Sequence, residues 1–228
     1  MGRVKKLFGW RSRILAGCAG LLLAGCQTAP ADRMLDSYVL NAARSAEAGH
    51  DHGAAAARYA SLIDAAHPDP GLVIAQARNL RRSGQVAEAV AALDNALNRL
   101  GPRADLLIEL GKQHVADGKP ERAIDPLLQA ARLAPADWEA EHVLGISCDR
   151  MGRHDEARAH YEKAAGLSPG NARILNNLAL SRAMAGDLET GLQLLERAAT
   201  LPAAPAQVQA NLQLIARIKA AEAAEAPR

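Results

Sequence analysis

Seven histidines and three cysteines are the residues of this sequence best suited to metal binding or nucleophilic chemistry. The densest histidine cluster is His50-Asp51-His52. Alternate residues point to the same side only in an extended segment, whereas this cluster falls in a turn between two expected helices. A structural metal site needs about four ligands, and no third or fourth ligand is evident near the cluster. We therefore expect no metal site and no cofactor.

Other residues that could do chemistry also have a structural interpretation. The glycines stand singly, outside any GxGxxG or GxxxxGK pattern, and the sequence holds no HExxH motif or nucleophile elbow. Cys148 falls on an expected helix, where a packed thiol is more common than a reactive one. Asp155-Glu156 begin a helix and stabilise the positive end of its dipole. His142 and His154 each stand alone and are expected to be solvated. We expect a protein that is not an enzyme.

The amino terminus has the pattern of an export signal. The first 13 residues carry five basic side chains and no acidic one, and an uncharged apolar run from Ile14 to Ala24 follows. This order of a basic and a short apolar segment is typical of a secretory signal. The apolar run is far shorter than the roughly 20 residues that span a bilayer as a helix. We therefore predict a signal and no permanent membrane span in this segment.

The apolar run ends in Leu23-Ala24-Gly25-Cys26, which resembles the lipobox of bacterial lipoproteins. The resemblance implies that residues 1–25 are removed as a signal peptide and that Cys26 carries a diacylglycerol, with residues 26–35 as the lipidated cysteine and its tether. A second match ends at Cys18 but has almost no apolar run before it. The alternative is an ordinary signal peptide with an incidental cysteine. Gln27 replaces the aspartate that often retains lipoproteins in the inner membrane, which implies the outer membrane, facing the periplasm.

The body of the chain repeats with a period of 34 residues. Three series of small residues keep this spacing: Gly84, Gly118, Gly152 and Gly186; Ala89, Ala123, Ala157 and Gly191; and Ala96, Ala130, Ala164 and Ala198. The 51 alanines and 31 leucines of the chain also favour helices over strands. An internal repeat of this length is typical of a solenoid of stacked helical units.

Each unit reads as helix, turn, helix. In the clearest one, a first helix begins at Trp138, Gly152-Arg153 form the turn, and a second helix runs from Asp155 to Gly166. The unit resembles the tetratricopeptide repeat (TPR), whose pattern is filled by Trp138, Leu144, Gly145, Ala157, Tyr161, Ala164 and Pro169. The resemblance implies an all-α fold, a right-handed superhelical TPR solenoid of helix-turn-helix repeats.

The same register divides the chain into about five TPR units. They cover residues 36–69, which are degenerate, and residues 70–103, 104–137, 138–171 and 172–205. From residue 206 to 221, Val208, Leu212, Ile215 and Ile218 form one apolar stripe, as in a helix that caps the end of a repeat array. We therefore assign residues 206–228 to a C-terminal capping helix and a frayed tail.

The concave surface made by the first helices is the expected site of function. The resemblance implies that positions two, five, nine, twelve and thirteen of each unit line a groove. Our candidate groove residues for binding a partner are Arg78, Arg81, Arg82, Lys112, His142, Asp149, Asn176 and Leu180. The upstream end is basic and the downstream end more apolar, which suits an extended or helical protein segment with an acidic end. The alternative is that these side chains are merely solvated helix faces. The carboxylate clamp of some TPR proteins is not reproduced by Asn176 and Asn177 alone.

The charge of the chain is nearly balanced. The formal charge is +2, which argues against a nucleic-acid binder driven by counterion release. Without the first 25 residues, 22 basic side chains face 25 acidic ones, a formal charge of −3. We therefore expect protein partners and a lipid-anchored contact with the membrane, and no nucleic acid.

Residues 176–202 and 206–218 resemble the end of the TadD family of the Flp/Tad pilus-assembly system. The resemblance implies a TPR lipoprotein, a non-enzymatic scaffold at the outer membrane that helps a pilus or its secretin to assemble. Two alternatives stay open. One is another periplasmic TPR lipoprotein adaptor, which recruits peptidoglycan enzymes or assembles outer-membrane proteins. The other is an enzyme or metal-binding protein that uses the His50 region.

Overall fold

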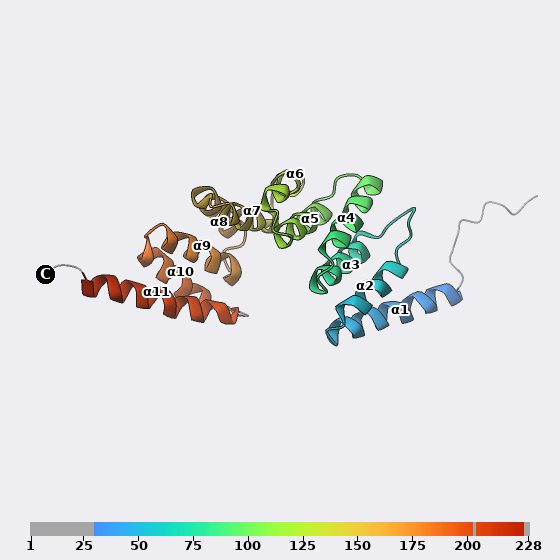
Figure 1. Cartoon of the computed structure of the whole chain (residues 1–228), viewed down its shortest axis with the longest axis horizontal. Helices are drawn as coiled ribbons and strands as arrows, with labels where there is room; N and C mark the ends of the chain where they lie inside the picture. The colour runs from blue at the N-terminus through green and yellow to red at the C-terminus, as the bar shows by residue number, and fades with distance from the viewer. Residues whose placement is uncertain (1–29, 203, 226–228) are drawn as a thin grey trace, which may run out of the picture. The chain divides into compact units, whose positions relative to one another are not determined.

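The computed structural model describes residues 30–202 and 204–225. Eleven α-helices, one 3-10 turn and no strand lie among these residues (Figure 1). The helices are α1 (Pro30–Ala48), α2 (His52–Ser61), α3 (Pro70–Arg82), α4 (Val86–Leu100), α5 (Ala104–Ala116), α6 (Ile124–Leu133), α7 (Trp138–Arg150), α8 (His154–Leu167), α9 (Ala172–Met184), α10 (Leu188–Ala199) and α11 (Ala206–Glu225), with the 3-10 turn η1 (Pro120–Ala123). The predicted all-α fold is confirmed.

The packing divides the chain after Tyr38, within α1, and residues 39–228 form one compact unit. All contacts described below lie in this unit. No helix of the described ranges is both long and apolar enough to cross a bilayer. The predicted signal peptide and Cys26 fall outside the described residues.

Neighbouring helices pack in the order of a solenoid. The pairs α3 and α4, α5 and α6, α7 and α8, and α9 and α10 are each in contact, and each second helix also touches the first helix of the next pair. The first helices α3, α5, α7 and α9 also touch one another in succession. The last helix, α11, contacts both α10 and α9, which is the place that the first helix of a further unit would take. Consecutive first helices therefore form a continuous surface.

The glycine series explains how each first helix ends. Gly84, Gly118, Gly152 and Gly186 have φ between 71° and 85°. This left-handed region is costly for residues with a Cβ atom. At Gly152, the chain reverses so that Arg153 N–H donates to the Cys148 carbonyl at 2.9 Å, which closes the helix end. Each of these turns therefore requires a glycine, and because the turn recurs once per unit, the glycine recurs every 34 residues.

A second 34-residue pattern fixes the seam between the two helices of a unit. A Cβ atom added to Gly145 would overlap the ring of Tyr161, and one added to Gly111 would overlap Leu127. The equivalent places in the neighbouring units hold buried alanine–leucine pairs, Ala77 with Leu93 and Ala179 with Leu195. A small residue on the first helix therefore makes room for a large one on the second.

The helix bounds differ from expectation at three places. The second helix of unit 104–137 starts as the 3-10 turn η1, because Pro126 has no N–H to bond the preceding turn. Helix α1 begins at Pro30, inside the segment expected to be a tether, where proline suits a first helical position. Helix α11 continues to Glu225, beyond residue 221, where the expected apolar stripe ends.

Candidate functional site

A groove of about 590 Å³ lies along the successive first helices α3, α5 and α7 and reaches the start of α9. Five of the candidate residues line it, and we call this surface the basic groove. They are Arg78, Arg81, Arg82, Lys112 and His142. Trp138, Val143 and Ile146 of α7 supply apolar lining. The first helices thus bring together residues that lie up to 95 positions apart in the sequence, from Arg78 to Arg173.

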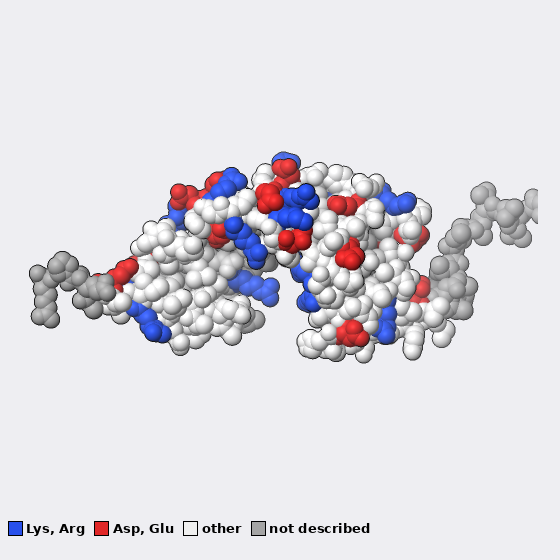
Figure 2. Space-filling model, viewed as in Figure 1, with Lys and Arg blue, Asp and Glu red and all other residues white. Residues whose placement is uncertain are grey.

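The basic groove has an excess of positive charge. Six cationic side chains line it, against two carboxylates, Glu109 and Glu139, so the lining has a formal charge of +4. The six are Arg78, Arg81, Arg82, Lys112, Arg150 and Arg173. Where charged side chains gather along the upper part of the face shown in Figure 2, basic and acidic ones are interspersed. The excess is therefore local, in a chain whose total formal charge is only +2.

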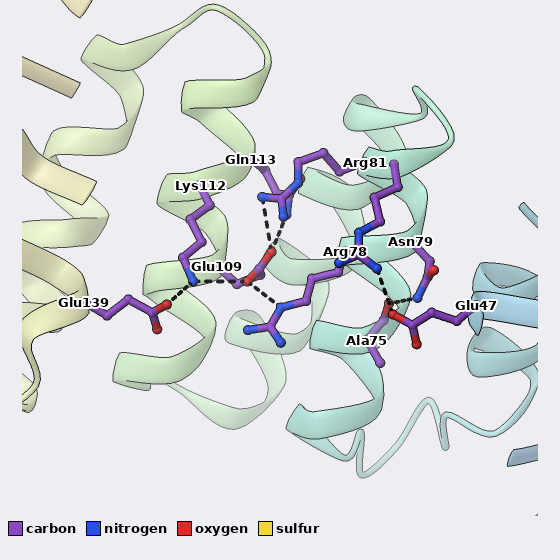
Figure 3. Close-up of polar contacts among 10 residues, drawn as sticks. Glu47, Ala75, Arg78, Asn79, Arg81, Glu109, Lys112, Gln113 and Glu139 are labelled. Carbon is purple, nitrogen blue, oxygen red and sulfur yellow. Dashed lines mark hydrogen bonds and ion pairs between the residues drawn. The ribbon is translucent and has the colours of Figure 1, made fainter. Parts of the chain in front are cut away.

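A buried carboxylate organises the upstream part of the groove. Glu109 is 1% exposed and accepts a hydrogen bond from Arg78 Nε at 3.0 Å (Figure 3). Gln113 Nε2 donates to its other oxygen at 2.7 Å, and the cations of Arg81 and Lys112 lie within 3.7 Å of the carboxylate. A carboxylate is rarely buried without such partners, because its desolvation is costly. Glu109 therefore holds three cations of two helices in place.

Two further ion pairs extend this network along the helices. Lys112 Nζ lies 2.7 Å from a carboxylate oxygen of Glu139, which joins α5 to α7. Arg82 lies 3.0 Å from Glu47 of α1, and the Tyr59 hydroxyl donates to the same carboxylate at 3.1 Å. Arg82 and Lys112 are thus each paired with a carboxylate of a neighbouring unit.

Arg150 and Arg173 are in a different position. Neither forms an ion pair with any side chain of the described residues, and both are exposed. Arg150 donates only to the backbone carbonyl of Val115, at 3.1 Å. Their guanidinium groups therefore line the groove as positive charges that no carboxylate of the described residues neutralises.

The expectation that His142 is solvated is wrong. Its side chain is buried between the rings of Trp138 and Tyr161, with ring centres 5.7 and 6.0 Å away, and its Nε2 accepts a hydrogen bond from the Asn177 amide at 3.0 Å. Burial lowers the pKa of His142 from its ordinary value of 6.5 to about 4, against the opposing effect of Glu139. At neutral pH His142 is an uncharged part of the groove floor.

The other candidate residues do not line the basic groove. Asp149 accepts a hydrogen bond from the Tyr161 hydroxyl at 2.9 Å and lies 3.0 Å from His154 Nδ1, so it links α7 to α8. Burial raises the pKa of Tyr161. Asn176 is buried and accepts from the Asn211 amide of α11 at 2.8 Å. Leu180 packs against the core beneath α9 and α10. These three side chains stabilise the fold at the places where we expected partner contacts.

Sequence reasoning missed Glu109, Val143 and Trp138 as groove residues. Glu109 is the sixth residue of its unit, and the equivalent places in three other units hold Ala75, Val143 and Asn177. The other units have an uncharged residue at this position. The charge of Glu109 could therefore have indicated a buried ion pair. Trp138 fills a packing position of the repeat pattern, which gave no reason to place it in a groove.

The residues first considered for metal or nucleophilic chemistry have structural surroundings. Asp51 caps α2 by accepting from Ala54 N–H at 3.0 Å, and His52 Nδ1 lies 3.0 Å from Asn79 Oδ1. Within residues 30–202 and 204–225, no group of three or more His, Cys, Asp or Glu side chains could hold a metal ion. Cys148 is buried, and burial raises the pKa of its thiol, which disfavours the nucleophilic thiolate.

Comparison with known sequences supports the helical-repeat interpretation. The sequence model described as tetratricopeptide repeat matches residues 74–138 and 143–208, more than half of the chain. An uncharacterized protein, y4yS, of Sinorhizobium fredii is 32% identical over 112 residues, which cover 49% of this chain and 61% of that protein. Tetratricopeptide repeat protein 7B of Homo sapiens is 28% identical over 53% of this chain and 15% of its own length. The chain spans less than two thirds of the length of these relatives.

Solved structures share the fold. A thermophilic TPR protein of Thermus thermophilus superposes with a TM-score of 0.67 at 19% identity, over 79% of this chain and 98% of that one. The crystal structure of MamA protein superposes with a TM-score of 0.57 at 21% identity, over 72% of this chain and 89% of that one. At these identities the likeness concerns the arrangement of the helices.

Proposed function

This chain belongs to the tetratricopeptide repeat family, and we propose that it is a non-enzymatic scaffold that holds a protein partner in its basic groove. Proteins of this family are generally non-catalytic scaffolds, and their fold implies protein partners. The observation that carries the proposal is the basic groove itself, an open surface along three successive first helices and the start of a fourth. Its lining includes partly exposed apolar side chains and two arginines that form no ion pair within the described residues. Such a surface suits an extended or helical segment.

We further propose that the scaffold is attached to the outer membrane and faces the periplasm. The support is the lipobox resemblance of residues 23–26, the basic and apolar segments before it, and Gln27 after the cysteine. Multiple acyl chains on Cys26 would hold the protein to a membrane far more firmly than a single chain.

The partner that we propose is a component of a Flp/Tad-type pilus or its secretin. The support is the resemblance of residues 176–202 and 206–218 to the end of the TadD family, together with the lipobox and the repeat number. In this role the groove would hold a subunit while the secretin or pilus machinery assembles.

The lipid anchor is tested by the processing of the precursor in the bacterium that carries the gene. Globomycin should cause the unprocessed precursor to accumulate, and Cys26→Ser should prevent lipid attachment. Cys18→Ser is the matched control, because Cys18 ends the weaker lipobox match, and this variant should be processed normally. Normal lipidation of Cys26→Ser would contradict the assignment.

The pilus role is tested by deleting the gene. Surface pili and secretin multimers should decrease in the deletion strain, and the wild-type gene should restore both, whereas Cys26→Ser should restore them poorly. Normal pili together with normal secretin multimers in the deletion strain would contradict this role. A neighbouring secretin gene and secretion ATPase gene would support it independently.

A further inference from the structure

We propose that the basic groove recognises an acidic segment of the partner, whose carboxylates pair with Arg150 and Arg173. The inference rests on the proposed scaffold function and names the chemistry of the segment that is bound. Charge complementarity is the argument, because six cations line the groove against two carboxylates.

The pairing within the chain shows where the unneutralised charge lies. Glu109 is shared by three cations, Glu139 pairs with Lys112, and Glu47 pairs with Arg82. Even with Glu47 included, three carboxylates face six cations, so an excess of three positive charges remains. Arg150 and Arg173 carry two of these charges, and no described side chain forms an ion pair with them.

The organisation of the cations favours binding of carboxylates. Arg78 and Arg81 are held by Glu109, so their positions are set before a ligand arrives, which reduces the entropy lost on binding. Arg150 and Arg173 carry planar guanidinium groups, which can each bind a carboxylate through two parallel hydrogen bonds. Arg150 ends α7 and Arg173 lies in the first turn of α9, so the acidic residues would lie over the downstream half of the groove. This differs from the sequence-based expectation of an acidic end at the upstream side, because the upstream cations are already paired with Glu47 and Glu109.

The remainder of the lining favours a protein segment over a nucleic acid. Trp138 and Ile146 offer partly exposed apolar surface between the cations, which suits apolar side chains of a peptide. A segment that alternates acidic and apolar residues matches this lining.

The test measures the binding of defined peptides to the full chain purified in a neutral detergent. The probe is a fluorescein-labelled peptide of Glu, Leu and Ser, and its counterpart has Gln in place of every Glu. Fluorescence anisotropy should show binding of the Glu peptide that weakens as the salt concentration rises, and much weaker binding of the Gln peptide.

The groove variant is Arg150→Gln/Arg173→Gln. Both sites are exposed, so its helical content should match that of the wild type, and loss of the Arg150–Val115 hydrogen bond should lower the melting temperature only slightly. We expect at least about tenfold weaker binding of the Glu peptide, because two charge-assisted contacts are lost. The matched control is Arg99→Gln/Arg132→Gln, which removes the same charge from exposed positions on the second helices α4 and α6. This control should bind as the wild type does.

Three results would overturn the proposal. One is equal binding of the Glu and Gln peptides, and another is an equal loss of affinity in the groove and control variants. The third is displacement of the Glu peptide by a single-stranded oligonucleotide that is added at the same concentration of negative charges. This would show that the groove recognises negative charge alone and not a protein segment. A negative result would refute only the proposal that the bound segment is acidic. The deletion and processing experiments test the scaffold function and the lipid anchor separately.

Discussion

Glu109 is the residue on which the basic groove depends most. It is almost fully buried, and two cations of α3 and one of α5 reach its carboxylate. The three cations are partly exposed, with side-chain exposures of 47%, 29% and 19%, so water can solvate them if the carboxylate is lost. The arrangement therefore couples the stability of two units to the position of the groove charges.

Replacement of this carboxylate gives the first prediction. Glu109→Gln should lower the free energy of unfolding by about 1–3 kcal/mol, because charge-assisted hydrogen bonds are lost while the amide keeps the volume. Urea unfolding at neutral pH measures this. The control is Glu121→Gln, at an exposed position of η1 without an ion pair, which should change stability by less than about 0.5 kcal/mol. Equal effects of the two substitutions would contradict the role of Glu109.

His142 gives a prediction about pH. Its pKa is about 4 in the folded chain and 6.5 in an exposed imidazole, so the unfolded chain binds the additional proton within this window. Stability supplied by neutral His142 is therefore complete above pH 6.5 and is lost as the pH falls toward 4.

The comparison with His142→Gln isolates this effect from other titrating groups. The free-energy advantage of the wild type over the variant should shrink by roughly 2 kcal/mol between about pH 7.5 and pH 5. Urea unfolding of both proteins across this range measures it. If the two proteins showed the same pH dependence, His142 would not be buried in its neutral form.

At the scale of the helices, the seam between α7 and α8 gives the third prediction. Gly145→Ala should lower the free energy of unfolding by about 1–3 kcal/mol, because the added methyl group overlaps the buried Tyr161 ring. Gly166→Ala on α8 is the control, since nothing lies within 4 Å of its added methyl group, and it should stabilise by roughly 0.5–1 kcal/mol. Thermal unfolding distinguishes the two signs, and a gain in stability for Gly145→Ala would refute the close approach.

The helices show what the sequence could predict and why. The four turn glycines recur because a left-handed φ is needed after each first helix, and this steric demand is visible in a single sequence. The 3-10 start of the second helix at Pro120–Ala123 was missed because the repeat register gave no weight to Pro126. The start of α1 at Pro30 was missed because the expected tether outweighed a proline suited to a first helical turn.

At the scale of the whole molecule, the candidate groove was predicted in part. Its five upstream residues were found because family positions place them on one surface. Asp149 and Asn176 also occupy such positions, but Tyr161 and Asn211 bind them. Whether a side chain at a groove position is available to a partner therefore depends on residues 12 to 35 positions away in the sequence that can bind it first. The repeat pattern does not predict these contacts.

The central claim is that the surface of the first helices, and not that of the second helices, holds a protein partner. Benzoylphenylalanine placed at Ala116 in the basic groove and, separately, at Ala159 on α8 tests it directly, because both alanines are exposed. After irradiation of living cells, we predict a discrete crosslinked adduct from Ala116 that is absent at Ala159 and is reduced by Arg150→Gln/Arg173→Gln. Adducts of equal yield at both positions, or an adduct at Ala159 alone, would contradict the claim.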